Sequence, residues 1–168
     1  MRNLLSANFL RLRKSVLFWG LLAVMFAFGA FFTLQHLNHY LKWDAKFYLT
    51  IDLFTYALLL GFGMAVFIPL FFGAEHSDGT FRNKLMAGHT RLSIYLSHLI
   101  TSIAVAISAA AAYVLPVLAV GLFIYEPPAL EPGTLILLAL GTLALLAAYC
   151  ALYTLVVMNC ARKSGAAV

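Results

Sequence analysis

The sequence predicts an all-α fold, a polytopic membrane helical bundle with four transmembrane helices. Hydrophobic residues make up 64% of the 168 residues and charged residues only 10%, which is too little charge to cover the surface of a soluble domain. The apolar residues form four long runs, so lipid is expected to surround most of the chain. Backbone groups in lipid need internal hydrogen bonds, and strict apolar–polar alternation is absent, so we expect helices rather than a barrel.

The four apolar runs each reach the length of about 20 residues that a helix needs to cross the hydrocarbon core. We expect spans at about residues 16–34, 53–73, 94–125 and 133–158. The third run is long enough to tilt, and Pro116 within it favours a kink. The small residues from Ser108 to Ala112 predict close packing against another helix.

The distribution of basic residues predicts the orientation of the chain. Nine of the eleven Lys and Arg residues lie in the N-terminal tail, the second loop and the C-terminal tail: Arg2, Arg11, Arg13, Lys14, Arg82, Lys84, Arg91, Arg162 and Lys163. The first loop has only Lys42 and Lys46, and the third loop, residues 126–132, has none. Both chain ends and the second loop are therefore expected in the cytoplasm. Anionic lipid accounts for the net charge of +5, so no nucleic-acid partner is expected.

Residues 1–14 are expected to form an amphipathic helix at the membrane surface, ahead of a transmembrane domain at residues 15–168. Leu5, Phe9, Leu12 and Val16 follow helical spacing, and basic residues occupy other positions. This pattern predicts a helix lying in the inner leaflet that leads into the first span. The alternative is a frayed basic tail that only sets the orientation.

The long polar passage at residues 73–100 separates the second span from the third. Ser77 or Asp78 can cap a short helix over residues 79–87, and Gly88 is well placed to end it. Thr90 can cap the helix that leads into the third span. The result is a short cytoplasmic helix bounded at both ends.

One face of this short helix carries Phe81 and Leu85, which are four residues apart. This apolar face is too small to support a core, so it suits docking into a groove on a partner. Glu75 stands where the second span ends. It is either a boundary acid bonded to nearby donors such as Thr80, or a clasp that holds the short helix.

These residues resemble those of bacterial ABC-2 type transporter permeases, in which a polar E-x-S-x-G-T passage follows the second span. The matching pattern comprises Glu75, Ser77-Asp78-Gly79-Thr80, Arg82-Asn83-Lys84-Leu85, Gly88-His89, Arg91 and Ile94-Tyr95-Leu96-Ser97. A second match is the basic opening with Asn3-Leu4-Leu5, Asn8-Phe9, Arg11-Leu12, Lys14-Ser15 and Phe18-Trp19.

The resemblance implies a permease subunit of an exporter in the bacterial cytoplasmic membrane, which dimerises with a second permease chain. A cytoplasmic ATPase subunit would dock on the loop at residues 74–94, with the short helix as coupling helix. The expected coupling residues are Asp78, Gly79, Thr80, Phe81, Arg82, Lys84, Leu85 and Gly88. The sequence contains no G-x-x-x-x-G-K-[ST], so ATP is expected on a separate P-loop polypeptide. Family members usually have six spans, so we interpret this chain as the four-span N-terminal portion, incomplete at its C-terminus.

Two other hypotheses remain open. One is a four-helix membrane cytochrome that uses histidine ligands, for which His98 is the candidate nearest to a span. The other is a small accessory membrane protein that binds a partner without transporting anything. For the permease we expect no cofactor, no metal and no enzymatic activity. Membrane lipid is an expected partner.

Overall fold

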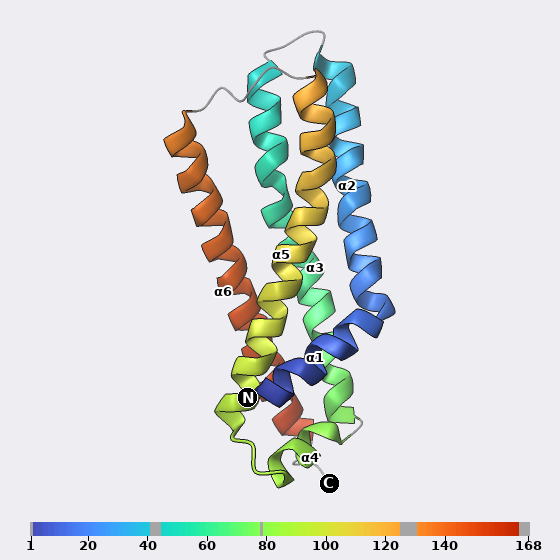
Figure 1. Cartoon of the computed structure of the whole chain (residues 1–168), viewed down its shortest axis with the longest axis vertical. Helices are drawn as coiled ribbons and strands as arrows, with labels where there is room; N and C mark the ends of the chain where they lie inside the picture. Colours follow the sequence, from blue (N-terminus) through green and yellow to red (C-terminus); the bar gives the residue numbers. More distant parts are fainter. Residues whose placement is uncertain (1, 41–44, 78, 125–130, 165–168) are drawn as a thin grey trace.

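The computed structural model describes residues 2–40, 45–77, 79–124 and 131–164. Within these ranges the regular elements are six helices (Figure 1). They are α1 (Arg2–Lys14), α2 (Val16–Tyr40), α3 (Ala45–Ser77), α4 (Thr80–Met86), α5 (Arg91–Ile124) and α6 (Pro132–Ser164). Asp78, parts of the two expected external loops (residues 41–44 and 125–130), Met1 and residues 165–168 lie outside the described residues.

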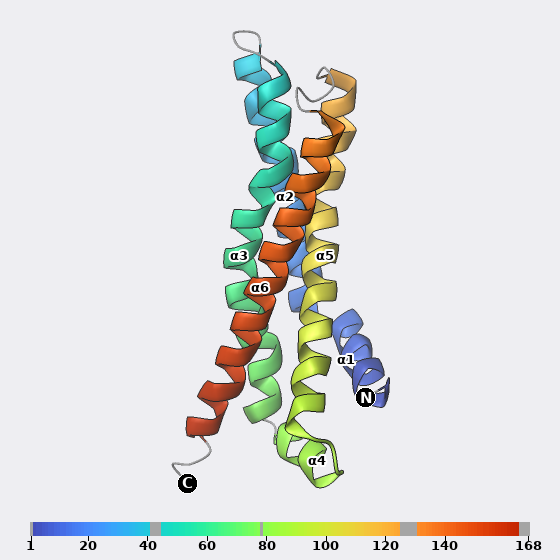
Figure 2. The ribbon, with the colours of Figure 1, turned by 90° about the vertical axis from the view of Figure 1, so that its left-hand side faces the viewer.

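Four of these helices are long and apolar enough to cross a membrane, which confirms the prediction of a four-span helical bundle. Their candidate spans are Val16–Gln35, Leu53–Glu75, Arg91–Val120 and Gly133–Asn159. The four helices run along the long axis of the molecule, and α4 lies beyond one end of the bundle (Figure 2). α1 and the C-terminal end of α6 lie at that same end (Figure 1).

The core of the bundle lies between α3 and α5, which bury far more of their spans than α2 and α6 do. Fully buried residues on α3 include Leu60 and Met64, and those on α5 include Val105 and Val117. The outer faces of α2 and α6 carry large exposed apolar side chains. In lipid this exposure carries no hydrophobic penalty, so packing quality decides how the helices associate.

α2 and α5 approach each other closely at Gly29. A Cβ atom on Gly29 would lie 2.5 Å from the backbone oxygen of Tyr113 and 3.0 Å from the ring of Pro116. Only glycine therefore fits at this crossing. Ala109 and Ala110 of α5 are buried nearby in sequence, which agrees with the packing role expected for the small residues of the third span.

α1 ends at Lys14 and α2 begins at Val16, so the chain turns at Ser15. α1 lies at the α4 end of the bundle (Figure 1). Two hydrogen bonds hold this elbow: Ser15 N donates to Leu12 O at 3.0 Å, and the Trp19 indole donates to Arg13 O at 3.0 Å. The elbow therefore has a defined geometry.

The buried face of α1 is not the predicted one. Leu12 is 5% exposed and belongs to the core, whereas Phe9 is 41% and Val16 is 86% exposed. The buried row is Leu4, Asn8 and Leu12, spaced four residues apart, on a helix that packs against α5. We expected Leu12 to share one apolar face with Leu5, Phe9 and Val16. Instead Leu12 belongs to the protein core, in a row whose middle residue, the polar Asn8, does not stand out in a hydrophobic pattern.

Candidate functional site

The candidate site is centred on Glu75, whose side chain is 2% exposed in the last turns of α3. Three other helices each direct a side chain at this carboxylate. Arg11 Nη1 of α1 lies 2.8 Å from Oε1, and Lys84 Nζ of α4 lies 2.6 Å from Oε2. His98 Nε2 of α5 lies 3.1 Å from Oε2. We call Glu75, Arg11, Lys84 and His98 the clasp.

The three partners in the clasp offset the free-energy cost of burying the carboxylate of Glu75. A carboxylate removed from water is stable only when charged or hydrogen-bonded partners compensate for the lost hydration. Here both oxygens of Glu75 have partners. Four helices are therefore joined at one group, and two of the partners are distant in sequence: Arg11 is separated from Glu75 by 64 residues and His98 by 23.

Arg11 makes two further contacts with α3. Its Nη2 donates to the carbonyl oxygen of Phe71 at 2.8 Å, and its guanidinium carbon lies 4.8 Å from the centre of the Phe71 ring. The guanidinium group can serve two acceptors and stack on an aromatic face at once, which an ammonium group cannot match. Arg11 therefore attaches α1 to α3 along a full helical turn.

His98 is 1% exposed, and its ring stacks on Phe72 with 4.1 Å between the ring centres. Its backbone oxygen accepts a hydrogen bond from Ser102 Oγ, which lies 3.4 Å from Thr154 Oγ1 of α6. Because Nε2 of the His98 ring contacts Glu75, the geometry gives no support to His98 as a haem ligand. Among the described residues no cluster of His, Cys, Asp and Glu side chains is arranged to hold a metal ion.

The start of α4 differs from the predicted cap. The helix begins at Thr80, and the cap position is Gly79 with φ of 67° and no side-chain cap hydrogen bond. The cap position is thus Gly79 rather than Ser77. Asp78 lies outside the described residues, so capping by Asp78 stays a prediction. The chain needs a left-handed residue where it leaves α3, and glycine adopts that conformation without strain.

The end of α4 follows the prediction. Gly88 has φ of 83°, its N–H donates to Leu85 O at 3.0 Å, and His89 N donates to Lys84 O at 3.2 Å. This pair of bonds is the Schellman arrangement, which satisfies the last carbonyls of a helix. Thr90 caps α5 as predicted, because its Oγ1 accepts from Ser93 N at 3.2 Å. The expected stop at Gly88 and cap at Thr90 are confirmed.

The side chains of α4 divide into two groups. Lys84 points back to Glu75 and its side chain is only 13% exposed. None of the residues of α4 is buried; Phe81 and Leu85 are half-buried, while Arg82 and Met86 are exposed. Most of the predicted coupling residues thus lie together on α4 and its flanking glycines, with Lys84 directed toward the bundle.

Sequence reasoning identified Glu75 and Lys84 but missed two members of the clasp. The partners of Glu75 are Arg11, Lys84 and His98 rather than Thr80. Arg11 was interpreted as one of the basic residues that set the orientation of the chain, and His98 was considered as a candidate haem ligand. The available signal was weak: a single acid at a span boundary needs cations, but the sequence does not say which of several nearby basic residues reach it.

Fold and site together define a polytopic α-helical membrane protein that holds a short helix outside its bundle through buried ion pairs. The profile of the family described as ABC-2 family transporter protein matches residues 4–168. The chain therefore belongs to the ABC-2 transporter family and is a multi-pass membrane permease component of an ABC exporter. Neither the curated proteins nor the solved structures gave a match.

Proposed function

We propose that this chain is the membrane permease subunit of an exporter whose energy comes from a separate P-loop ATPase docked on α4. The observation that carries this proposal is the clasp. Lys84 of α4 contacts the same carboxylate as Arg11 of α1 and His98 of α5. A displacement of α4 by a bound ATPase would therefore act on three helices at once. Family membership supports the partnership with an ATP-binding subunit.

The surface of α4 supports a docking role. Phe81 and Leu85 are half-buried, and Met86 is 70% exposed at the end of the helix. Large apolar side chains outside the lipid region favour contact with a partner. In this proposal the residues from Asp78 to Gly88 that we predicted for coupling form the contact surface and its bounding turns, while Lys84 transmits the motion.

We also propose the orientation and assembly expected from the sequence. α1, α4 and the end of α6 lie at one end of the bundle (Figures 1 and 2), which supports a cytoplasmic location for all three. α1 would then lie in the inner leaflet of a bacterial cytoplasmic membrane, with exposed Phe9 and Leu10 facing lipid. A second permease chain would pair with this one to enclose a pathway.

A pull-down tests the docking proposal. The full chain in detergent is mixed with the P-loop ATPase that copurifies from its native membrane. Phe81→Ala combined with Leu85→Ala should weaken binding about thirty-fold, because two half-buried apolar side chains each lose roughly 1 kcal/mol of remaining burial. Arg82→Ala is the matched control on the same helix and should change binding less than five-fold. A larger loss with Arg82→Ala than with the double variant would contradict the apolar docking surface.

Cysteine labelling tests the proposed orientation. With Cys150 and Cys160 replaced, a cysteine at Glu131 should react with an impermeant reagent from outside the cell. A cysteine at Arg82 should react only after the membrane is opened. Both positions are exposed in the structure, so labelling reports sidedness rather than burial. The reverse pattern would overturn the assignment of α4 to the cytoplasm.

A further inference from the structure

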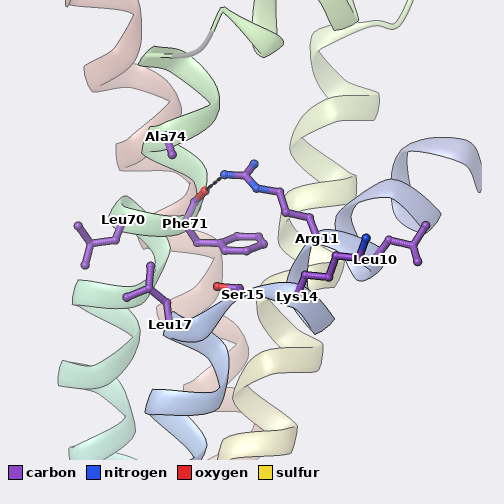
Figure 3. Close-up of a pocket in the computed structure, with 8 residues that line it drawn as sticks. All are labelled: Leu10, Arg11, Lys14, Ser15, Leu17, Leu70, Phe71 and Ala74. Atoms are coloured by element: carbon purple, nitrogen blue, oxygen red, sulfur yellow. Dashed lines mark hydrogen bonds between the residues drawn. The ribbon is translucent and has the colours of Figure 1, made fainter.

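A hollow of about 540 Å³ lies beside the clasp, where α1, the start of α2 and the end of α3 meet. Figure 3 shows its lining: Arg11 and Lys14 extend from α1, Leu17 lies on α2, and Leu70 and Phe71 lie on α3. Ser15 at the elbow contributes a hydroxyl group. The hollow therefore has one basic wall and one apolar wall.

The charge around this hollow is positive. Glu75 carries one negative charge, but two cations, Arg11 and Lys84, contact it. Arg11 uses Nη1 on Glu75 and Nη2 on Phe71 O, while its side chain remains 37% exposed. Lys14 is exposed and has no hydrogen bond or ion pair among the residues that the structure describes. Its ammonium group is available to an anion.

A second hollow of about 430 Å³ adjoins the first and shares Leu17 and Leu70 with it. It runs between α2 and α3 and is lined almost entirely by apolar side chains, with Gly20 and Gly63 also in its wall. A Cβ atom on Gly20 would meet nothing within 4 Å, so this part of the groove is open. Gly20 lies four residues beyond Val16, which is about 6 Å farther along the helix.

We propose that the two adjoining hollows form one binding site for an anionic phospholipid of the leaflet on the α4 side. The phosphate would lie near Lys14, Ser15 and the exposed edge of Arg11, and an acyl chain would lie in the groove at Gly20 and Gly63. The order of the walls matches this ligand: the basic groups precede the candidate span that begins at Val16, and the apolar groove lies within it. A free phosphate would leave the groove unfilled, and a neutral lipid would leave Lys14 without a counter-charge.

The charge requirement is tested by lipid retention. The full chain is purified in detergent with equal amounts of phosphatidylglycerol and phosphatidylcholine of matched acyl chains, and bound lipid is counted by native mass spectrometry. The wild-type chain should retain one phosphatidylglycerol in preference to phosphatidylcholine. Lys14→Gln should lower this retention about five-fold, the change given by one basic group near an anionic lipid. Arg13→Gln removes a charge from the adjacent exposed position outside the hollow and should leave retention within two-fold of wild type.

The groove is tested by filling it. Gly20→Leu places a side chain where the acyl chain would lie and should abolish selective retention. Gly141→Leu is the matched control on α6, because Gly141 is equally exposed and open. Excess glycerol 3-phosphate should not displace the bound lipid. Equal losses with Lys14→Gln and Arg13→Gln, equal retention of the two lipids by the wild-type chain, or unchanged retention in Gly20→Leu would each overturn the proposal.

Discussion

The two halves of the bundle are held together by different kinds of contact. At the α4 end, buried charges join α1, α3, α4 and α5 at Glu75. Along the middle of the bundle, α2 can pack closely against α5 because Gly29 has no side chain. Buried apolar residues fill the space between α3 and α5. Ion pairs depend on which atoms face each other, whereas small-residue packing depends on shape. Damage to the first should alter communication between helices, and damage to the second should alter their assembly.

The largest expected effect comes from Glu75→Gln, which keeps the shape of the side chain but removes the charge shared by the clasp. Without the carboxylate, Arg11, Lys84 and His98 lose their shared negative partner. Breaking a buried ion pair lowers the free energy of unfolding by about 3–5 kcal/mol. Because Arg11 is partly exposed, we expect the lower end, about 3 kcal/mol. Thermal unfolding in detergent measures this loss, and Glu131→Gln at an exposed position is the control.

Activity measurements on Glu75→Gln test whether the clasp also transmits motion from α4. If the clasp carries motion from α4, the Glu75→Gln permease should still bind the ATPase. Transport substrate should then no longer stimulate most of the ATP hydrolysis that it stimulates with the wild-type permease. Retained stimulation in a correctly folded variant would show that the clasp serves stability alone. In that case α4 would have to act on the bundle through its chain connections.

A smaller effect is expected at the centre of the bundle. Gly29→Ala introduces a Cβ atom 2.5 Å from a backbone oxygen, so α2 and α5 must separate. Overpacking of this kind costs about 1–3 kcal/mol. Gly20→Ala on the same helix has open space and should not destabilise the chain. Equal stability of the two alanine variants would contradict the close approach at Gly29.

The smallest expected effect is the loss of a helix cap. Thr90→Ala removes the acceptor for Ser93 N and should destabilise the start of α5 by about 1 kcal/mol. Thr90→Ser keeps the hydroxyl group and should recover most of this loss. Hydrogen exchange of the first turn of α5 measures the effect more directly than global unfolding, because Thr90 lies at the exposed α4 end.

The sequence was sufficient for features that depend on local chemistry. Four apolar runs specify four spans, Gly88 provides the left-handed residue that ends α4, and Thr90 provides a cap. Each of these depends on residues within a few positions of one another. The start of α4 was predicted to within one residue, but its cap position, Gly79, was not, because polar residues and a glycine that can adopt a left-handed conformation stand side by side there.

Long-range partners could not be predicted in the same way. Arg11 and Glu75 are 64 residues apart, and their contact depends on the angle at which α1 leaves α2. That angle depends on burial of Leu4, Asn8 and Leu12 against α5, a row whose central polar residue hides it from a hydrophobic pattern. The clasp is therefore a consequence of tertiary packing, although its central acid was recognisable from its place at the end of a span.

The elbow at Ser15 gives α1 and α2 the form of a bent lever. Arg11 attaches the short arm to Glu75, and the Trp19–Arg13 hydrogen bond stiffens the bend. The long arm, α2, has 25 residues and is about 37 Å long. A rotation of about 5° at the elbow would displace its far end by about 3 Å, by the geometry of a rigid rod of that length. If α1 and α2 move as one rigid unit, a sub-ångström displacement at the clasp would become a displacement of several ångströms at the far end of α2, and the close fit at Gly29 would move α5 with it.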